Sequence, residues 1–188
     1  MMTEINDRGE CVSLEKQAEL VEKSAYYAKN ASIAVMSGSL PKGVDDDFYY
    51  KLIKAMPAGV KIAVDCEGEK LKKALSAGVY LVKPNLAELE NFMGEPCRGI
   101  SGAIKGALKM IEKGAENVLL SLGREGALLT DGKTHLYCRS ANVAVNSTVG
   151  AGDCALAAAC VKIEAGASRE EILRSAVAAG TASITTPG

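Results

Sequence analysis

Short apolar runs alternate with helical patterns along most of the chain, and this alternation constrains the fold more than any other feature. Four runs are dominated by apolar residues, at 32–36, 60–65, 79–82 and 117–120. Between them, apolar residues recur three and four positions apart, which predicts amphipathic helices. Buried strands joined by helical crossovers are typical of parallel sheets. The sequence therefore predicts an α/β fold, with a mostly parallel sheet covered by helices on both faces.

Local signals mark the ends of several of these elements. Ser13 can cap a helix whose apolar stripe is formed by Leu14, Ala18, Val21, Ala25 and Ala28. A later helix is opened by three consecutive acids, 45–47, and the last one by a capping box of Ser168 and Glu171. An Asp131-Gly132 turn between 127–130 and 134–138 predicts a β-hairpin.

The composition excludes several classes of protein. The 188 residues are 48% apolar with a net charge of −1, which is typical of one soluble globular domain. Basic residues are scattered and aromatic residues make up only 4%, so we expect no nucleic-acid partner. No run is long and apolar enough for a membrane, and the polar N-terminus is unlike a signal peptide. The six cysteines form no CxxC pair; Cys154 and Cys160 are expected to behave as small hydrophobic residues in a helix of a cytoplasmic protein.

The stretch Gly150-Ala151-Gly152-Asp153 precedes a run of helix-forming residues. Two glycines allow a sharp turn and a close approach of a ligand to the backbone. The unpaired N–H groups and the positive dipole end of the following helix suit a phosphate group. Asp153 could then face a phosphoryl acceptor as a base, although an acid in a first helical turn can also simply complement the helix dipole.

Other polar residues follow the predicted strands, at the sheet edge where α/β proteins bind ligands. Asn85 and Glu88 lie three positions apart at a helix start, where they could hold the waters of a Mg²⁺ ion. The same spacing fits a simple capping box. Asp65 also ends a strand and could be only a helix cap. Ser121-Leu122-Gly123 with Gly126 reads locally as a turn between two strands.

The motifs together resemble those of one known family. Residues 147–153 (Ser-Thr-Val-Gly-Ala-Gly-Asp) are similar to the C-terminal signature of the ribokinase-like (PfkB) carbohydrate kinases. Residues 85–88 match its Asn-x-x-Glu motif, which follows a strand. Residues 37–43 (Ser-Gly-Ser-Leu-Pro-Lys-Gly) resemble the Ser-Gly-Ser-Leu-Pro-x-Gly loop of its sugar-phosphate kinase branch, with Lys42 where proline is frequent. Without the resemblance, this loop could be only a connection between two elements.

The resemblance implies a ribokinase-like fold and a role for each matching residue. The catalytic residues would be Asp153 with Gly150, Ala151 and Gly152. The nucleotide would be bound by Lys83, Asn85, Glu88, Ser121, Gly123 and Gly126. The substrate would contact Ser37, Ser39 and Asp153, and the metal would be placed by Asn85, Glu88 and Asp65.

The implied activity is transfer of phosphate from ATP, with Mg²⁺, to fructose 1-phosphate, which gives fructose 1,6-bisphosphate. Tagatose-6-phosphate kinase and 6-phosphofructokinase are alternatives within the family. A non-catalytic nucleotide-binding module is an alternative of another class. The expected partners are ATP and a ketohexose phosphate, with a homodimer as an option for the full-length parent.

The resemblance covers the whole chain but only the later part of the family. Residues 1–188 are therefore expected to form a single α/β nucleotide-binding core that lacks the N-terminal portion and the β-lid of the family. The segment 3–13 would follow the last lid strand, and relatives would continue beyond Gly188. As a fragment, the chain is expected to bind ATP·Mg²⁺ weakly and to be inactive on its own.

Overall fold

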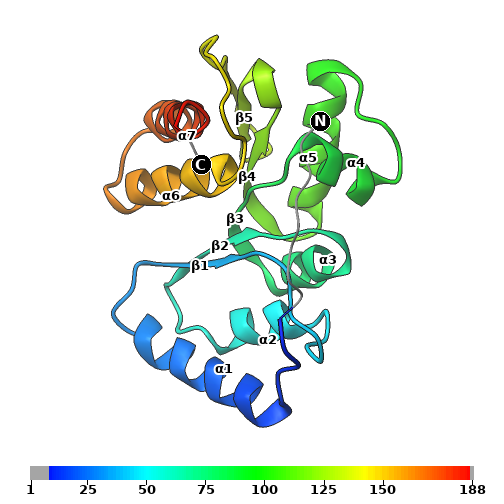
Figure 1. The fold of residues 1–188 in the computed structure, drawn as a ribbon, viewed down its shortest axis with the longest axis vertical. Coiled ribbons are helices and arrows are strands. Elements are labelled where there is room, and N and C mark those ends of the chain that lie inside the picture. Colours follow the sequence, from blue (N-terminus) through cyan, green and yellow to red (C-terminus); the bar gives the residue numbers. More distant parts are fainter. Residues whose placement is uncertain (1–8, 187–188) are drawn as a thin grey trace.

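A six-stranded sheet crosses the molecule in the order β1-β2-β3-β4-β5-β6 (Figure 1). The computed structural model describes residues 9–186, so much of the predicted irregular segment 3–13 and the last two residues lie outside the described residues. The strands are β1 (Ile33–Ser37), β2 (Lys61–Asp65), β3 (Val79–Val82), β4 (Ala115–Ser121), β5 (Ala127–Thr130) and β6 (His135–Cys138). Strands β1 to β4 are parallel to one another, whereas β4 with β5 and β5 with β6 form antiparallel pairs. The prediction of a mostly parallel sheet is confirmed.

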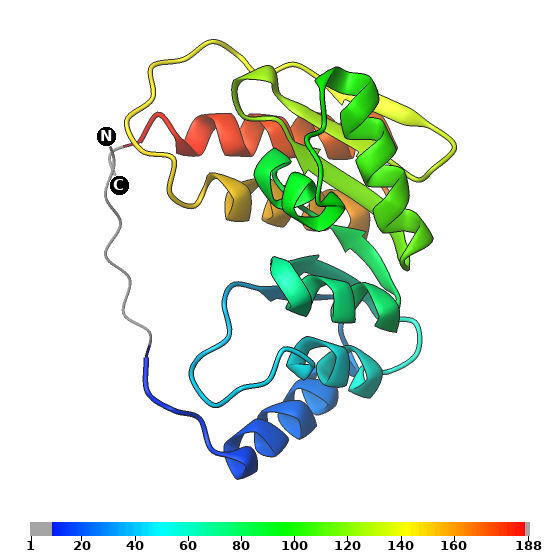
Figure 2. The ribbon, with the colours of Figure 1, turned by 90° about the vertical axis from the view of Figure 1, so that its right-hand side faces the viewer.

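Helices cover both faces of this sheet, as the sequence predicted. One face carries α2 (Phe48–Ala55), α3 (Gly68–Ala77), α4 (Leu86–Met93) and α5 (Gly99–Glu112), with α1 (Leu14–Ala28) packed beside α2. Each parallel strand lies next to its predecessor, and right-handed crossovers place all the connecting helices on the same face. The other face is therefore left for α6 (Ala151–Glu164) and α7 (Arg169–Ser183), which lie side by side (Figure 2).

Each face has its own apolar core. Leu71, Leu75 and Leu89 are at most 1% exposed in the core beneath α2 to α5. Leu156 and Leu173 are each 2% exposed in the core beneath α6 and α7. Truncating such a leucine to alanine costs about 2–5 kcal/mol, so these two cores hold the helices on the sheet. Among the described residues, none of the helices combines the length and apolarity that a membrane span requires.

Several expectations about element ends and burial need correction. β4 begins at Ala115 and α5 at Gly99, two residues earlier than the apolar patterns indicated. In α1, Leu14 is 78% exposed and the buried positions are Gln17 and Ala28, so the predicted apolar stripe is only partly buried. Cys154 is exposed, whereas Cys160 is buried as expected.

The predicted hairpin exists, but its turn differs from a two-residue Asp-Gly turn. Thr130 pairs with His135, which leaves four residues, 131–134, in the loop. The carboxylate of Asp131 accepts hydrogen bonds from the backbone N–H groups of Lys133 at 2.9 Å and Thr134 at 2.7 Å. The side chain of Asp131 therefore closes the loop, as aspartate often does in turns.

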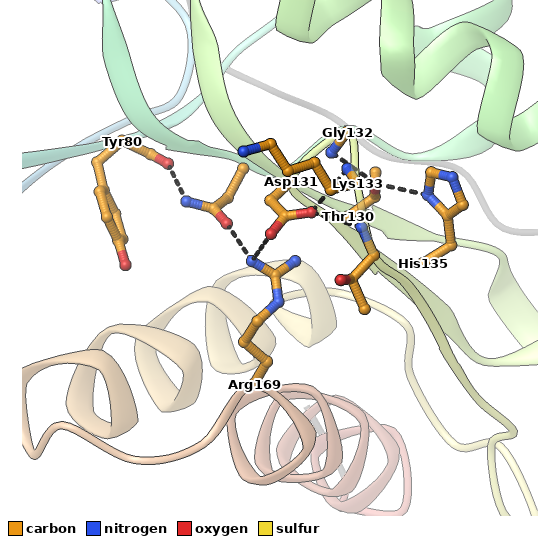
Figure 3. A network of polar contacts seen from close by, with 9 residues as sticks. Tyr80, Thr130, Asp131, Gly132, Lys133, His135 and Arg169 are labelled. Atoms are coloured by element: carbon orange, nitrogen blue, oxygen red, sulfur yellow. Dashed lines mark hydrogen bonds and ion pairs between the residues drawn. The ribbon is translucent and has the colours of Figure 1, made fainter.

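This hairpin is tied to α7 by a network of polar side chains (Figure 3). The Arg169 NH1 group contacts Asp131 Oδ2 at 3.0 Å and donates a hydrogen bond to Asn117 Oδ1 at 2.9 Å. The amide of Asn117 in turn donates to the carbonyl of Tyr80 at 3.0 Å. The network thus joins β3, β4, the hairpin and the start of α7, at the end of the sheet opposite to the carboxyl ends of the parallel strands.

Candidate active site

The carboxyl ends of β1 and β2 and the first turns of α3, α4 and α6 surround one pocket of about 260 Å³. In a parallel sheet these ends share one edge, so side chains that follow different strands meet there. Four of the lining residues carry a carboxylate and one carries an ammonium group. The pocket is lined by Ser37, Gly38, Ser39, Asp65, Cys66, Glu67, Lys70, Glu88 and Asp153.

The start of α6 has the backbone geometry that the glycines suggested. Gly150 is the N-cap residue and adopts a left-handed conformation with φ of 79°, which glycine accommodates without a Cβ penalty. The first N–H groups of a helix have no intrahelical acceptor. The N–H groups of Ala151, Gly152 and Asp153 belong to this first turn. Together with the positive end of the helix dipole, they favour an anionic group at this position.

Asp153 meets the end of β1 across the pocket. Its side chain is exposed, and its Oδ1 accepts a hydrogen bond of 3.4 Å from the hydroxyl group of Ser37. The two residues are 116 positions apart in the sequence, so only the fold brings them together. The carboxylate keeps one oxygen free of side-chain hydrogen bonds from the described residues. An exposed carboxylate beside an anion-binding helix start can accept a proton from a bound hydroxyl group.

Lys83 and Asp65 form an ion pair beneath the start of α6. The ammonium group lies 3.0 Å from Asp65 Oδ2, and the two side chains are only 6% and 16% exposed. A Cβ atom on Gly152 would come within 2.9 Å of Lys83 Nζ. A side chain at position 152 would therefore push the ammonium group away from its place beside Asp65. The predicted nucleotide residue Lys83 and the predicted metal residue Asp65 are thus brought together below the turn at Gly150 to Asp153.

Asn85 and Glu88 form a complete capping box at the start of α4. Glu88 donates its backbone N–H to Asn85 Oδ1 at 2.9 Å, and Asn85 donates its own backbone N–H to Glu88 Oε2 at 2.9 Å. The Asn85 amide also donates to Glu88 Oε1 at 2.8 Å. Burial raises the pKa of the Glu88 carboxyl, against the lowering effect of the Asn85 hydrogen bond. The capping role considered for this pair is present, and both carboxylate oxygens of Glu88 have hydrogen-bond donors.

The carboxylates of the pocket fit a site for a hydrated Mg²⁺ ion better than a site in which protein ligands enclose the metal. Within residues 9–186, no group of three or more His, Cys, Asp or Glu residues is arranged to hold a metal ion. Asp65, Glu67 and Glu88 nevertheless line the same pocket. Mg²⁺ keeps several waters and commonly binds through one or two carboxylates together with substrate phosphates. These carboxylates could hold such an ion through its waters once a polyphosphate is bound.

Ser121, Gly123 and Gly126 do not line this pocket. They follow β4, and Gly123 begins a short 3₁₀ helix, η1 (Gly123–Glu125). The backbone of Ser121 pairs with the segment before α4 through a hydrogen bond from its N–H to the carbonyl of Pro84 at 3.0 Å. Gly126 has a φ of 107°, and a Cβ atom there would overlap the carbonyl of Cys138. The backbone conformation and close packing therefore explain the glycine at position 126 without a ligand. A nucleotide role for this loop stays a prediction.

Sequence reasoning missed three residues that line the pocket: Cys66, Glu67 and Lys70. Cys66 and Glu67 follow Asp65 directly, and Lys70 lies in the first turn of α3, so their position after a strand was the available signal. Burial raises the pKa of the Cys66 thiol to about 12, so the thiol stays protonated at neutral pH. Within the described part of the chain, Lys70 makes no ion pair, whereas Lys83 is neutralised by Asp65.

Comparison with known proteins identifies the family. The model of the pfkB family of carbohydrate kinases matches residues 3–188. The chain belongs to the PfkB family. This result confirms the family that the sequence motifs suggested.

Among curated PfkB relatives, the chain is 33% identical over 182 residues to a 1-phosphofructokinase of Borreliella burgdorferi. It is 36% identical over 177 residues to the ATP-dependent 6-phosphofructokinase isozyme 2 of Escherichia coli. It is 35% identical over 179 residues to a D-tagatose-1-phosphate kinase of Bacillus licheniformis. These alignments cover 96%, 93% and 94% of this chain and 59%, 57% and 59% of the relatives. The chain thus spans less than two thirds of the length of these relatives.

Solved PfkB structures confirm the ribokinase-like fold. The structure of phosphofructokinase-2 from Escherichia coli in complex with potassium matches with a TM-score of 0.87 at 35% identity, over 95% of this chain and 58% of that chain. Arabidopsis thaliana ribokinase complexed with ribose and ATP matches with a TM-score of 0.72 at 27% identity, over 96% of this chain and 55% of that chain. The similarity extends over the sheet and the helices on both of its faces.

Proposed function

We propose that this chain is the nucleotide-binding core of a sugar-phosphate kinase that transfers the γ-phosphoryl group of ATP to fructose 1-phosphate. The observation that carries this proposal is the meeting of Asp153 and Ser37 at the start of α6. It places a proton acceptor beside a helix start that favours anions. Relatives named 1-phosphofructokinase, from Borreliella burgdorferi and Haemophilus influenzae, support the choice of substrate at 33% and 34% identity.

In the proposed reaction, the free primary hydroxyl group of the sugar attacks the γ-phosphorus atom, and the bond from phosphorus to the oxygen of the leaving ADP breaks. Asp153 accepts the proton of the hydroxyl group. The backbone N–H groups of Ala151, Gly152 and Asp153 stabilise the negative charge on the transferred group. In a largely dissociative transfer, positioning and neutralisation supply most of the acceleration, so a carboxylate is an adequate base.

Other residues of the pocket would bind and orient the two substrates. Mg²⁺, when bound, would supply charge neutralisation on the polyphosphate, and the residues proposed to place it are Asn85, Glu88 and Asp65. Lys83 lies next to Asp65 at the start of α6, close to where the phosphates would bind. Ser39 lines the pocket on the loop after β1 and is proposed to donate a hydrogen bond to the phosphate of the sugar. The proposed nucleotide contacts of Ser121, Gly123 and Gly126 would come from the neighbouring loop.

Related substrates remain alternatives within this proposal. A relative named as a 6-phosphofructokinase and another named as a D-tagatose-1-phosphate kinase match at 36% and 35% identity, which is no lower than the 1-phosphofructokinases. A non-catalytic nucleotide-binding module is the alternative of another class. The exposed carboxylate of Asp153 in the pocket favours a kinase over such a module.

The test uses the chain itself and a chimera in which residues 1–188 replace the matching region of Escherichia coli phosphofructokinase-2. We expect the chain to bind ATP·Mg²⁺ weakly in calorimetry and to form fructose 1,6-bisphosphate at a negligible rate. In the chimera, Asp153→Asn should lower turnover by about 10²–10⁴-fold, the usual contribution of a general base, and change ATP affinity by only a few-fold. Near-normal turnover of this variant would reduce Asp153 to a residue that complements the helix dipole.

A further inference from the structure

The loop formed by residues 38–43 follows β1 and is held at its far end by a buried glutamine. Gln17 on α1 is 9% exposed, and its amide group donates hydrogen bonds to the carbonyl of Gly43 and to that of Val12, each at 2.9 Å. The N–H of Val12 also donates to the carbonyl of Lys42 at 3.1 Å. The segment before α1 and the end of the loop are thus joined by this side chain and by one backbone hydrogen bond.

The near end of the same loop is held by a buried tyrosine. Tyr49 on α2 is 6% exposed, and its hydroxyl group donates to the carbonyl of Gly38 at 3.1 Å. The N–H of Gly38 donates to the carbonyl of Asp65 at 3.0 Å, so both backbone groups of this glycine are fixed. Burial raises the pKa of the Tyr49 hydroxyl to about 12, so the donor keeps its proton at neutral pH.

Neither the amide group of Gln17 nor the hydroxyl group of Tyr49 is needed to fill the apolar core. Gln17 and Tyr49 lie on the buried faces of α1 and α2, where an apolar side chain of similar size would pack without a polar atom to satisfy. A buried polar group costs free energy unless it finds a partner. Here each side chain finds its partner on the backbone of the 38–43 loop, and Gln17 finds a second on Val12. The loop itself carries Ser39, which faces the pocket.

We propose that Gln17 and Tyr49 are positioning residues, which fix the 38–43 loop in the conformation that receives the phosphate group of the sugar phosphate. This inference rests on the proposed function, in which Ser39 of this loop binds that phosphate. A loop that is already ordered loses less conformational entropy when its ligand arrives. The two residues therefore act on affinity for the sugar phosphate without touching it.

Hydrogen exchange of the ligand-free 188-residue chain tests the positioning directly. Tyr49→Phe and Gln17→Met each remove donors and keep the bulk of the side chain. A lost hydrogen bond is worth about 0.5–1.5 kcal/mol, so we expect exchange at the amides of residues 38–44 to become about two- to tenfold faster. Tyr50→Phe is the matched control, since Tyr50 neighbours Tyr49, is 38% exposed, and makes no hydroxyl hydrogen bond within the described chain. Unchanged exchange in both variants would overturn the inference.

Calorimetric titration with fructose 1-phosphate and with ATP then tests the consequence for binding, in a chimera in which residues 1–188 replace the matching region of the Borreliella burgdorferi 1-phosphofructokinase. The two variants should lower the affinity for fructose 1-phosphate about three- to tenfold and leave the affinity for ATP within twofold of its original value. Equal weakening of both ligands would indicate a general structural role and overturn the inference. If the unsubstituted chimera binds ATP but no fructose 1-phosphate, the proposed substrate fails and the positioning role for it fails too. Faster exchange with unchanged fructose 1-phosphate affinity would overturn the positioning role alone.

Discussion

The ammonium group of Lys83 lies 3.0 Å from the carboxylate of Asp65, and both side chains are largely buried beneath the first turn of α6. A cation at the positive end of a helix dipole is unfavourable by itself. Asp65 balances this charge in the ligand-free protein. A phosphate group bound at the start of α6 would give Lys83 a second anionic partner, so the pair links the stability of the core to the proposed nucleotide site.

Removing one member of this pair should cost more stability than removing both. Lys83→Met leaves the carboxylate of Asp65 buried without its partner, which typically costs about 3–5 kcal/mol. Lys83→Met combined with Asp65→Asn removes both charges and should recover a substantial part of that loss. Urea denaturation of the two variants measures the difference in the free energy of unfolding. A double variant that is less stable than Lys83→Met would show that the unpaired carboxylate of Asp65 carries no such cost.

Gly152→Ala should be harmful only while Lys83 is present. The added Cβ would lie 2.9 Å from Lys83 Nζ, so the ammonium group must move away from its place beside Asp65. We expect lower stability and weaker binding of ATP. In the background of Lys83→Met the clash disappears, and alanine should instead stabilise the helix by up to about 1 kcal/mol relative to glycine. A double-mutant cycle by thermal denaturation measures this coupling; equal effects in both backgrounds would argue against it.

Glu88 should titrate above the ordinary value of a glutamate, which is about 4.3. Burial raises the pKa of its carboxyl, so the folded state binds the proton more tightly than the unfolded chain. The stability contributed in this way is present below the unfolded pKa and is lost as the pH rises through the folded pKa. Carbon-13 NMR of the side-chain carboxyl follows the titration. Binding of ATP·Mg²⁺ should lower the midpoint because a nearby cation favours the carboxylate; no movement would place the ion elsewhere.

Arg169→Met should destabilise the protein without changing its affinity for ATP. The substitution leaves Asn117 Oδ1 and Asp131 Oδ2 without their guanidinium partner, at the end of the sheet far from the pocket. We expect a loss of about 1–3 kcal/mol, reduced by the 30% exposure of the Arg169 side chain. Arg174→Met on the exposed face of the same helix is the control and should stay within about 0.5 kcal/mol. Equal stabilities of the two variants would show that the network contributes little.

The sheet could be predicted because each parallel strand is marked by a short apolar run in its own sequence. The run 79–82 is apolar throughout, as expected of a strand covered on both faces, and the structure places it between two parallel neighbours. The antiparallel end was predicted from Asp131-Gly132, but the four-residue loop was not, since the side-chain closure of the turn depends on the conformation of residues 133 and 134. The burial of Gln17 was missed because a pattern of apolar residues cannot reveal a polar residue that finds partners distant in the sequence.

The position of the pocket could be predicted from the sequence, but the ion pairs that its side chains form could not. The rule that ligands bind beyond the carboxyl ends of parallel strands led to Asp65, the glycine turn before a helix led to Asp153, and the family resemblance led to Ser37. The fold places all three around one pocket. Nothing in the sequence tells which carboxylate neutralises Lys83, because that choice depends on the spacing between β2 and β3. Lys70 was missed for a related reason, since a lysine in a first helical turn is common and only the fold shows what it faces.

The contact between Ser37 and Asp153 also sets the order in which the site can form during synthesis. The strands β1 to β3 leave the ribosome long before α6, and the contact spans 116 positions, so it cannot close until the start of α6 has emerged. Such distant contacts are slow to form, and domains generally fold as units while the chain emerges. We therefore expect the carboxylate of Asp153 to reach Ser37 in one of the last folding steps.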